Sequence, residues 1–152
     1  VAADKNVTRI SAIGLKDEPG VAFRMFDALA KANINVDLIL QSIGREGTKD
    51  ISFTISGDAT DDAVKVLEEN KDKLGAKEIK TKTNVAKVSV VGAGMMSNHG
   101  VAAKANFLEC LYNSHININM ISTSEIIVTV LIEEEHTEKA MNAMHDMFEL
   151  QD

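Results

Sequence analysis

The chain has 152 residues, 45% of them hydrophobic and 26% charged, which is enough for one ordinary domain or two small ones. Its formal net charge of -7, without a cluster of lysine and arginine residues, argues against nucleic acid as a partner. No apolar run reaches the roughly 18 residues that span a bilayer, and the single cysteine excludes a disulfide framework, so we expect a cytoplasmic protein with no membrane partner.

The first half of the chain is predicted to fold in the order strand, helix, strand, strand, helix, strand. Its apolar patterns predict strands over residues 7–14, 34–40, about 49–55 and about 77–83, with a turn over 44–47. Apolar residues at helical spacing predict a helix from Val21, and Thr60 is expected to cap the second helix.

The second half repeats the first. Residues 85–92 reproduce the strand pattern of 7–14, 78 positions later (85 minus 7). Each of these strands is followed by a loop that ends in Gly-Val-Ala, then by a helical pattern and an Asn-rich segment. In the second copy we expect a strand from Ala86, a helix to about Asn113, a strand from Ile118, a strand over 126–132 and a helix over 137–148.

The second copy lacks its sixth element, because the pattern ends with a helix. Residues 1–7 stand 78 positions before 79–85, the stretch that ends the first copy, so residues 1–5 are expected to supply the missing strand. The sequence therefore predicts an α+β protein with two interlocked ferredoxin-like βαββαβ units, each an antiparallel sheet with helices on one face. The predicted domains are 7–83, and 1–5 with 85–152.

The turn before the first helix has the features of a ligand-binding corner. Pro19 suits the entry to a helix, Gly20 allows close approach of a ligand, and the following N–H groups lack intrahelical partners. Such a helix start attracts carboxylates.

Acids and amides near this turn indicate an amino-acid ligand. Asp17, together with Asn35, Asp37 and Gln41, is expected to converge on the helix start at 20–22 and to hold the ligand's ammonium group. The alternative is that Asp17 only forms a turn and that Asp37 only faces solvent.

Other motifs give weak signals. Residues 92–97 resemble a dinucleotide fingerprint without its third glycine, and the four histidines lack metal-ligand spacing. Ser122, Ser124 and His115 do not follow a hydrolase motif, and His99 is expected to be a loop residue that lines a pocket. We expect no catalytic residue, metal or cofactor.

Four segments of the chain resemble the pair of ACT domains at the C-terminal regulatory end of aspartate kinases. They are residues 17–22, 34–41, 90–95 and 120–126, and the resemblance covers essentially the whole chain. It implies a module without catalysis of its own that binds lysine, threonine or both and transmits feedback inhibition to a separate kinase domain or α subunit. The opening Val1 suggests a processed chain or an excised fragment, so the chain is either a small β subunit or a regulatory piece.

The resemblance implies an effector site where one ACT unit meets the other, usually across a homodimer. The residues that it assigns to this site are Asp17, Gly20, Val21, Ala22, Asn35, Val36, Asp37, Gln41, Asn117, Ile118, Ser124 and Glu125. Asp37 or Glu125 would suit the side-chain ammonium of lysine, and Gln41 or Ser124 the hydroxyl of threonine. The second unit has His99 where a proline is common, so its pocket is expected to be degenerate or to prefer another effector.

Two other function classes compete with a sensor. A structural dimerisation module would have the same fold without binding an effector. A small metabolic enzyme would need an acid/base pair or metal set, and the sequence has no such set.

Overall fold

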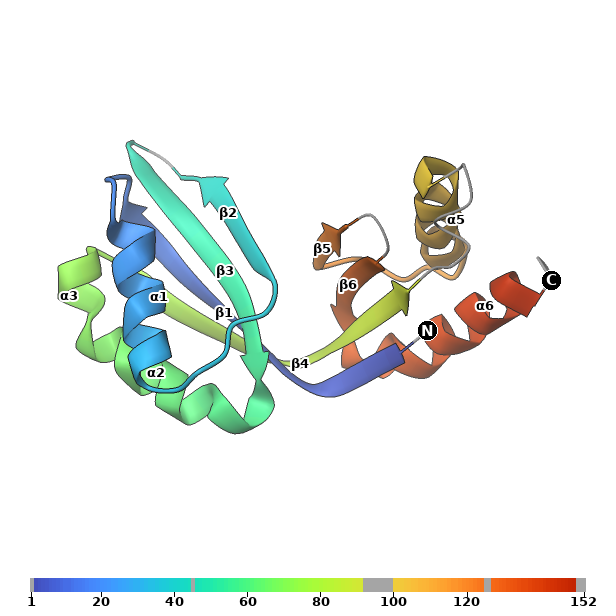
Figure 1. Ribbon diagram of the computed structural model, residues 1–152, viewed down its shortest axis with the longest axis horizontal. Coiled ribbons are helices and arrows are strands. Elements are labelled where there is room, and N and C mark those ends of the chain that lie inside the picture. The colour runs from blue at the N-terminus through green and yellow to red at the C-terminus, as the bar shows by residue number, and fades with distance from the viewer. Residues whose placement is uncertain (1, 45, 92–99, 125–126, 150–152) are drawn as a thin grey trace. The chain divides into compact units, whose positions relative to one another are not determined.

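The computed structural model describes residues 2–44, 46–91, 100–124 and 127–149 (Figure 1). The strands are β1 (Ala2–Lys16), β2 (Ile39–Ile43), β3 (Thr48–Ser56), β4 (Glu78–Val91), β5 (Met120–Thr123) and β6 (Ile127–Glu133). The helices are α1 (Val21–Lys31), α2 (Thr60–Glu69), α3 (Lys71–Leu74), α5 (Gly100–Asn113) and α6 (Thr137–Glu149). Short 3-10 turns, η1 (Gly57–Ala59) and η2 (Glu134–His136), precede α2 and α6.

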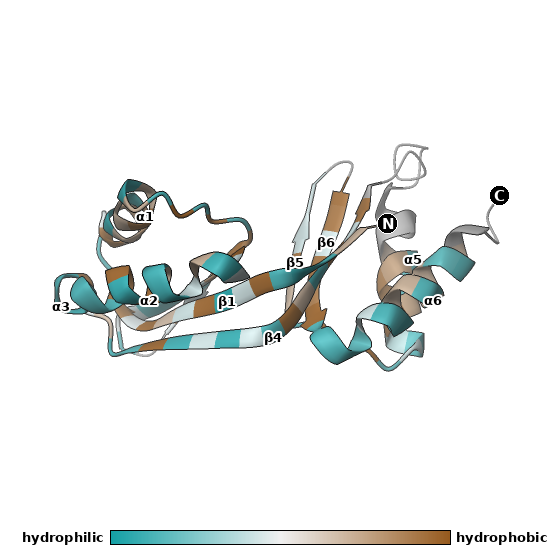
Figure 2. Cartoon of the chain, turned by 90° about the horizontal axis from the view of Figure 1, so that it is seen from below, coloured by the Kyte–Doolittle hydropathy of each residue, from teal (hydrophilic) through white to brown (hydrophobic). Residues whose placement is uncertain are grey.

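The chain divides into two compact units. The N-terminal unit is Asn6–Thr83, and the C-terminal unit is Val1–Lys5 with Asn84–Asp152. Strands β1 and β4 each have residues in both units, and polar and apolar residues alternate along them (Figure 2). None of the helices in the described residues has the length and apolar character needed to cross a membrane.

In the N-terminal unit, α1 and α2 cover one face of the sheet (Figure 1). Antiparallel pairing places Ile10 of β1 opposite Phe53 of β3, and both side chains lie in the core. Helix α1 buries Val21, Met25 and Leu29, whose spacing of four residues gives it one apolar face. The Phe26 ring packs edge-on against Phe53 with centroids 5.7 Å apart, which joins helix to sheet.

The C-terminal unit repeats this arrangement. Its core joins residues of β4 and β6 to Phe107 and Leu111 of α5 and to Ala140 and Met144 of α6. The two units also end their first helices alike. The carbonyl of Leu29 accepts the N–H of Ile34 at 3.0 Å, and that of Leu111 accepts the N–H of Ile116 at 3.0 Å. Asn33 and His115, the residues just before these two donors, both have a positive φ, so both helices end with the same left-handed turn.

The strand predicted over 34–40 begins later than expected. Asp37 N–H donates to the Thr54 carbonyl at 2.9 Å, and Thr54 N–H donates to the Leu38 carbonyl at 3.0 Å. Two residues thus face one residue of β3, and regular pairing starts only at Ile39, opposite Phe53. In the C-terminal unit β5 likewise begins at Met120, two residues after the predicted start.

The predicted cap at Thr60 is wrong. Thr60 is the first residue of α2, and its hydroxyl donates to the Gly57 carbonyl at 2.7 Å instead of accepting an N–H of the helix. Thr137 makes the same bond to the Glu134 carbonyl, at 2.6 Å. The reason is the 3-10 turn before each helix, which occupies the hydroxyl. The strand predicted to end at residue 83 also continues without a break into the next predicted strand, as β4.

Candidate functional site

The loop between β1 and α1 forms a corner with an uncapped helix start. Gly20 has φ +92°, and its carbonyl accepts the N–H of Arg24 at 2.9 Å, which closes the first turn of α1. No side chain caps this helix, and its first turn has no acid. The N–H of Asp17 donates to the Gly47 carbonyl at 3.1 Å, which ties the corner to the turn between β2 and β3. The helix start therefore presents a partial positive charge.

A bulge in β1 directs the chain into this corner. The register of β1 with β3 shifts between Ala12 and Leu15, and Gly14 there has φ +73°. The Asp50 carboxylate accepts the Gly14 N–H at 2.8 Å, so the bulged backbone is satisfied by a side chain of β3. A Cβ at Gly14 would lie 2.8 Å from Cδ of the Lys77 side chain, and the positive φ also favours glycine here. The sequence analysis missed this bulge.

Lys49 is a second feature that the sequence analysis missed. It faces Leu15 across β1 and Ile43 across β2, on the face of β3 that carries the core residues Ile51 and Phe53. Its side chain is 11% exposed, and its Nζ lies 3.9 Å from Oδ1 of Asp17, which is 60% exposed. The period-two pattern of β3 was a usable signal, because it places Lys49 in line with core residues.

Gln41 lies on the same face of the sheet as Lys49. It pairs with Ile51 in the middle of β2, and its side chain is exposed because β2 is an edge strand. The structure therefore brings four groups to one end of the N-terminal unit: the helix start at Gly20–Ala22, the Asp17 carboxylate, the Lys49 ammonium and, further along the sheet, the Gln41 amide.

The expected convergence of Asn35 and Asp37 on the helix start is wrong within one unit. These residues follow the C-terminal end of α1, and Asp37 bonds to Thr54, five positions along β3 from Lys49. At about 3.4 Å per strand residue, this separation is roughly 17 Å. The physical reason is that an 11-residue helix carries the chain back along the sheet before β2 begins.

The predicted residues of the C-terminal unit occupy corresponding places. Asn117 is exposed and Ile118 half-buried in the segment before β5, which corresponds to the segment before β2. Ser124 follows β5, donates its N–H to the Ile127 carbonyl at 2.8 Å and accepts the Ile127 N–H at its Oγ at 3.1 Å. Glu125, His99 and the glycine-rich stretch 92–97 lie outside the described residues.

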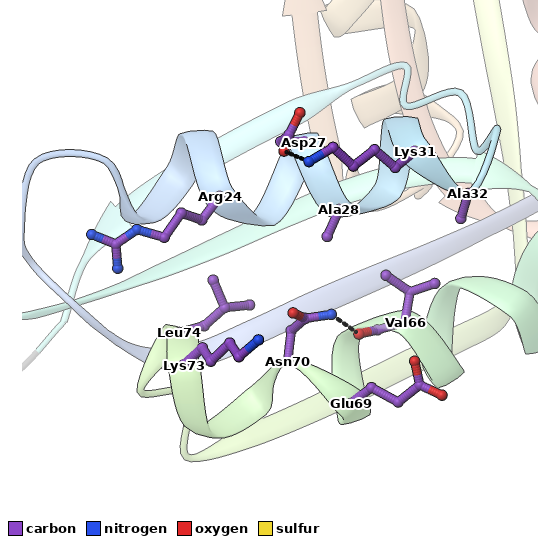
Figure 3. A pocket seen from close by; sticks show the side chains of 10 residues that line it. All are labelled: Arg24, Asp27, Ala28, Lys31, Ala32, Val66, Glu69, Asn70, Lys73 and Leu74. Atoms are coloured by element: carbon purple, nitrogen blue, oxygen red, sulfur yellow. Dashed lines mark hydrogen bonds and ion pairs between the residues drawn. The ribbon is translucent and has the colours of Figure 1, made fainter.

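Each unit also has a groove between its helices. In the N-terminal unit a cavity of about 480 Å³ is lined by residues of α1, α2 and α3 (Figure 3). Three of its polar side chains are already engaged: Asp27 and Lys31 form an ion pair at 2.9 Å, and Asn70 Nδ2 donates to the Val66 carbonyl at 2.7 Å. A cavity of the same volume lies between α5 and α6 and includes Cys110. None of the predicted site residues that the structure describes lines either groove. Within the residues that the structure describes, no cluster of three or more acids, histidines or cysteines is arranged to hold a metal ion.

The comparisons with known proteins agree with the repeated architecture. A family model described as the ACT domain matches residues 10–70 and again 88–148, once in each unit. The chain belongs to the ACT-domain family. Both ACT matches lie within the α+β units described above, so the predicted fold class and the resemblance are confirmed.

Solved structures with the same pair of ACT domains come from aspartokinases. A crystal structure of aspartokinase alpha and beta subunits matches with a TM-score of 0.86 and 45% identity, over 97% of this chain and 96% of that chain. The ligand-free regulatory subunit of aspartate kinase from Thermus thermophilus matches with a TM-score of 0.85 and 35% identity, over 95% and 94% of the two chains.

Curated relatives extend beyond the ACT pair. The aspartate kinase of Pseudomonas fluorescens (strain SBW25) is 41% identical over 150 residues, which are 99% of this chain and 36% of that protein. The aspartokinase of Helicobacter pylori (strain 26695) is 43% identical over 153 residues, again over 36% of its length. The ACT pair described here thus spans about a third of the length of the curated relatives it matches.

Proposed function

We propose that this ACT pair is an amino-acid sensor that binds threonine, lysine or both and transmits feedback inhibition to an aspartate kinase of aspartate-family amino-acid biosynthesis. The observation that carries the proposal is the charge pattern at the start of α1. The start of α1 has no side-chain cap and no acid in its first turn, and the Asp17 carboxylate stands four residues before Val21 in the loop that leads into it. A free amino acid has one charged group for each of these two features. The similarity to aspartokinase regulatory subunits supports the choice of enzyme.

The proposed binding mode uses the main chain for the part that all amino acids share. The effector carboxylate accepts the N–H of Ala22 and, in place of the Glu18 carbonyl 3.4 Å away, the N–H of Val21, and the absence of a side chain at Gly20 lets it approach. The effector ammonium pairs with Asp17. The Gln41 amide, on the same face of the sheet, is assigned to the effector side chain. The chain by itself is not proposed to phosphorylate aspartate.

We further propose that a second copy of the chain completes the site. Edge strand β2 exposes three apolar side chains, Ile39 at 55%, Leu40 at 45% and Ile43 at 94%, and an unpaired edge of this kind favours pairing with another strand. In such a homodimer the remaining predicted site residues belong to the contact between ACT units. They are Asn35, Val36, Asp37, Asn117, Ile118, Ser124 and Glu125.

The proposed regulation couples effector binding to the assembly. Binding orders the loop 17–20 and tightens the contact between ACT units, which favours one quaternary arrangement of the catalytic domain or α subunit over another. A coupling free energy of about 1–3 kcal/mol is typical of such switches. In this proposal the functional domains are 7–83, and 1–5 with 85–152.

The test is isothermal titration of the chain with threonine, lysine and methionine, singly and in pairs. We expect threonine or lysine to bind, and Asp17→Asn to weaken binding by roughly tenfold, since it removes a charge-assisted contact of about 1.5–3 kcal/mol. The control is Asp61→Asn, which removes an exposed acid from α2. Absence of binding together with an unchanged melting temperature would leave the structural dimerisation module as the better function.

A further inference from the structure

Lys49 is a buried cation that the proposed binding mode does not use. Residues 49, 51, 53 and 55 alternate onto the core-facing side of β3, and three of them are apolar core residues. Lys49 takes the place of a fourth apolar residue at the end of this row, with its side chain 11% exposed. The aliphatic stem of a lysine held in this way packs along apolar surface, and its ammonium lies at the end of the row, near Asp17.

The Lys49 ammonium lies directly beneath the binding corner. The backbone of Lys49 pairs with Leu15, two residues before Asp17, and the Asp17 carboxylate is 3.9 Å from Lys49 Nζ. Asp17 is in turn held by the bond of its N–H to Gly47. Gln41, which pairs with Ile51, lies on the same face of the sheet, one strand away from Lys49 and two positions along.

A second cation, Arg24, lies close to Gly20. Nη2 of Arg24 is 3.7 Å from the position that a Cβ on Gly20 would take. The acids of the loop are Asp17, which already faces Lys49, and Glu18, which is exposed. The charge of an exposed carboxylate is screened by solvent, whereas that of a mostly buried ammonium is screened less. The corner therefore accepts one carboxylate and one ammonium but opposes a second ammonium.

We infer that Lys49 makes the site selective for amino acids with an uncharged side chain, of which threonine is one, and against lysine. This inference rests on the proposed function. Threonine and lysine share the α-carboxylate and the α-ammonium, so Lys49 acts on both ligands alike through these groups. Only the ε-ammonium of lysine differs, and it enters the part of the site that Lys49 borders.

The experiment measures the ratio of the lysine and threonine dissociation constants by isothermal titration of the full 152-residue chain. For the unchanged protein we expect lysine to bind at least about tenfold more weakly, the order expected for two like charges several ångström apart in a partly solvated site. Lys49→Met, which replaces the unbranched stem by one that ends at the Cε position and removes the charge, should reduce this ratio by about tenfold.

Two variants control for other effects of the substitution. Lys49→Arg keeps the positive charge and should keep the ratio. Lys65→Met removes the same charge from an exposed position on α2 and should leave both affinities unchanged. Melting temperatures show which variants fold. If Lys49→Met does not fold, the ratio of dissociation constants measured on the unchanged protein still tests the inference.

The outcomes separate this inference from the proposed function. Equal or tighter binding of lysine by the unchanged protein, or an unchanged ratio in a folded Lys49→Met variant, overturns the role of Lys49 while the sensor function stands. No binding of either amino acid overturns both. Both are supported if the unchanged protein binds threonine more tightly than lysine and if this preference is lost in Lys49→Met but kept in the two control variants.

Discussion

The left-handed conformation of Gly20 gives a direct test of the binding corner through Gly20→Ala. At φ +92° an alanine is strained by about 1–2 kcal/mol, and its smaller unfolded-state entropy returns about 0.4–1 kcal/mol. A Cβ there would meet only Nη2 of Arg24, at 3.7 Å, so no steric clash adds to the strain. The expected loss is therefore about 1 kcal/mol of the free energy of unfolding, a fall in melting temperature of roughly 2–4 °C.

Gly47→Ala is the matched control for this variant. Gly47 has φ +74°, and no atom lies within 4 Å of an added Cβ. The Gly47→Ala variant should therefore show a similar fall in melting temperature in the same thermal scans. Only Gly20→Ala should also weaken threonine binding in a titration, because its methyl group stands at the helix start. A melting temperature equal to that of the unchanged protein would refute the strain argument. Equal threonine affinities of the two variants would refute the position of the carboxylate.

Three further predictions concern stability and reactivity. Leu29→Ala and Leu111→Ala, both fully buried at equivalent positions, should each cost about 2.7–5 kcal/mol in urea unfolding, and a loss under about 1 kcal/mol would contradict the packing. Thr137→Val should cost about 1 kcal/mol in the same assay, since its hydroxyl bonds to a carbonyl of η2 at 2.6 Å. Burial, and then the Asp146 carboxylate, raise the pKa of the Cys110 thiol, so less thiolate is present at pH 8 and iodoacetamide should react more slowly than with free cysteine. Asp146→Asn should speed this reaction, and an unchanged rate would exclude the carboxylate as a cause.

Local patterns predicted most of the secondary structure. The apolar spacing in 21–30 and 137–148 is helical and was sufficient for α1 and α6, because one face of each helix must be buried whatever it packs against. The duplicated Gly-Val-Ala and Asn-rich segments predicted two copies of one unit, and the family match covers both. The acidic corner before α1 was also visible, since Pro19 and Gly20 restrict the backbone by themselves.

The tertiary structure decided the features that depend on strand register. Only the pairing of β1 with β3 shows the bulge at Gly14, its bond to Asp50 and the position of Lys49 beneath Asp17. The pairing of the β2 segment with β3 likewise places Asp37 beside Thr54, away from the helix start. These contacts join residues far apart in the sequence, so no local pattern encodes them. The sequence by itself thus determined the repeat, the helices and the turn that opens α1, whereas cross-strand pairing decided which charges lie near that turn.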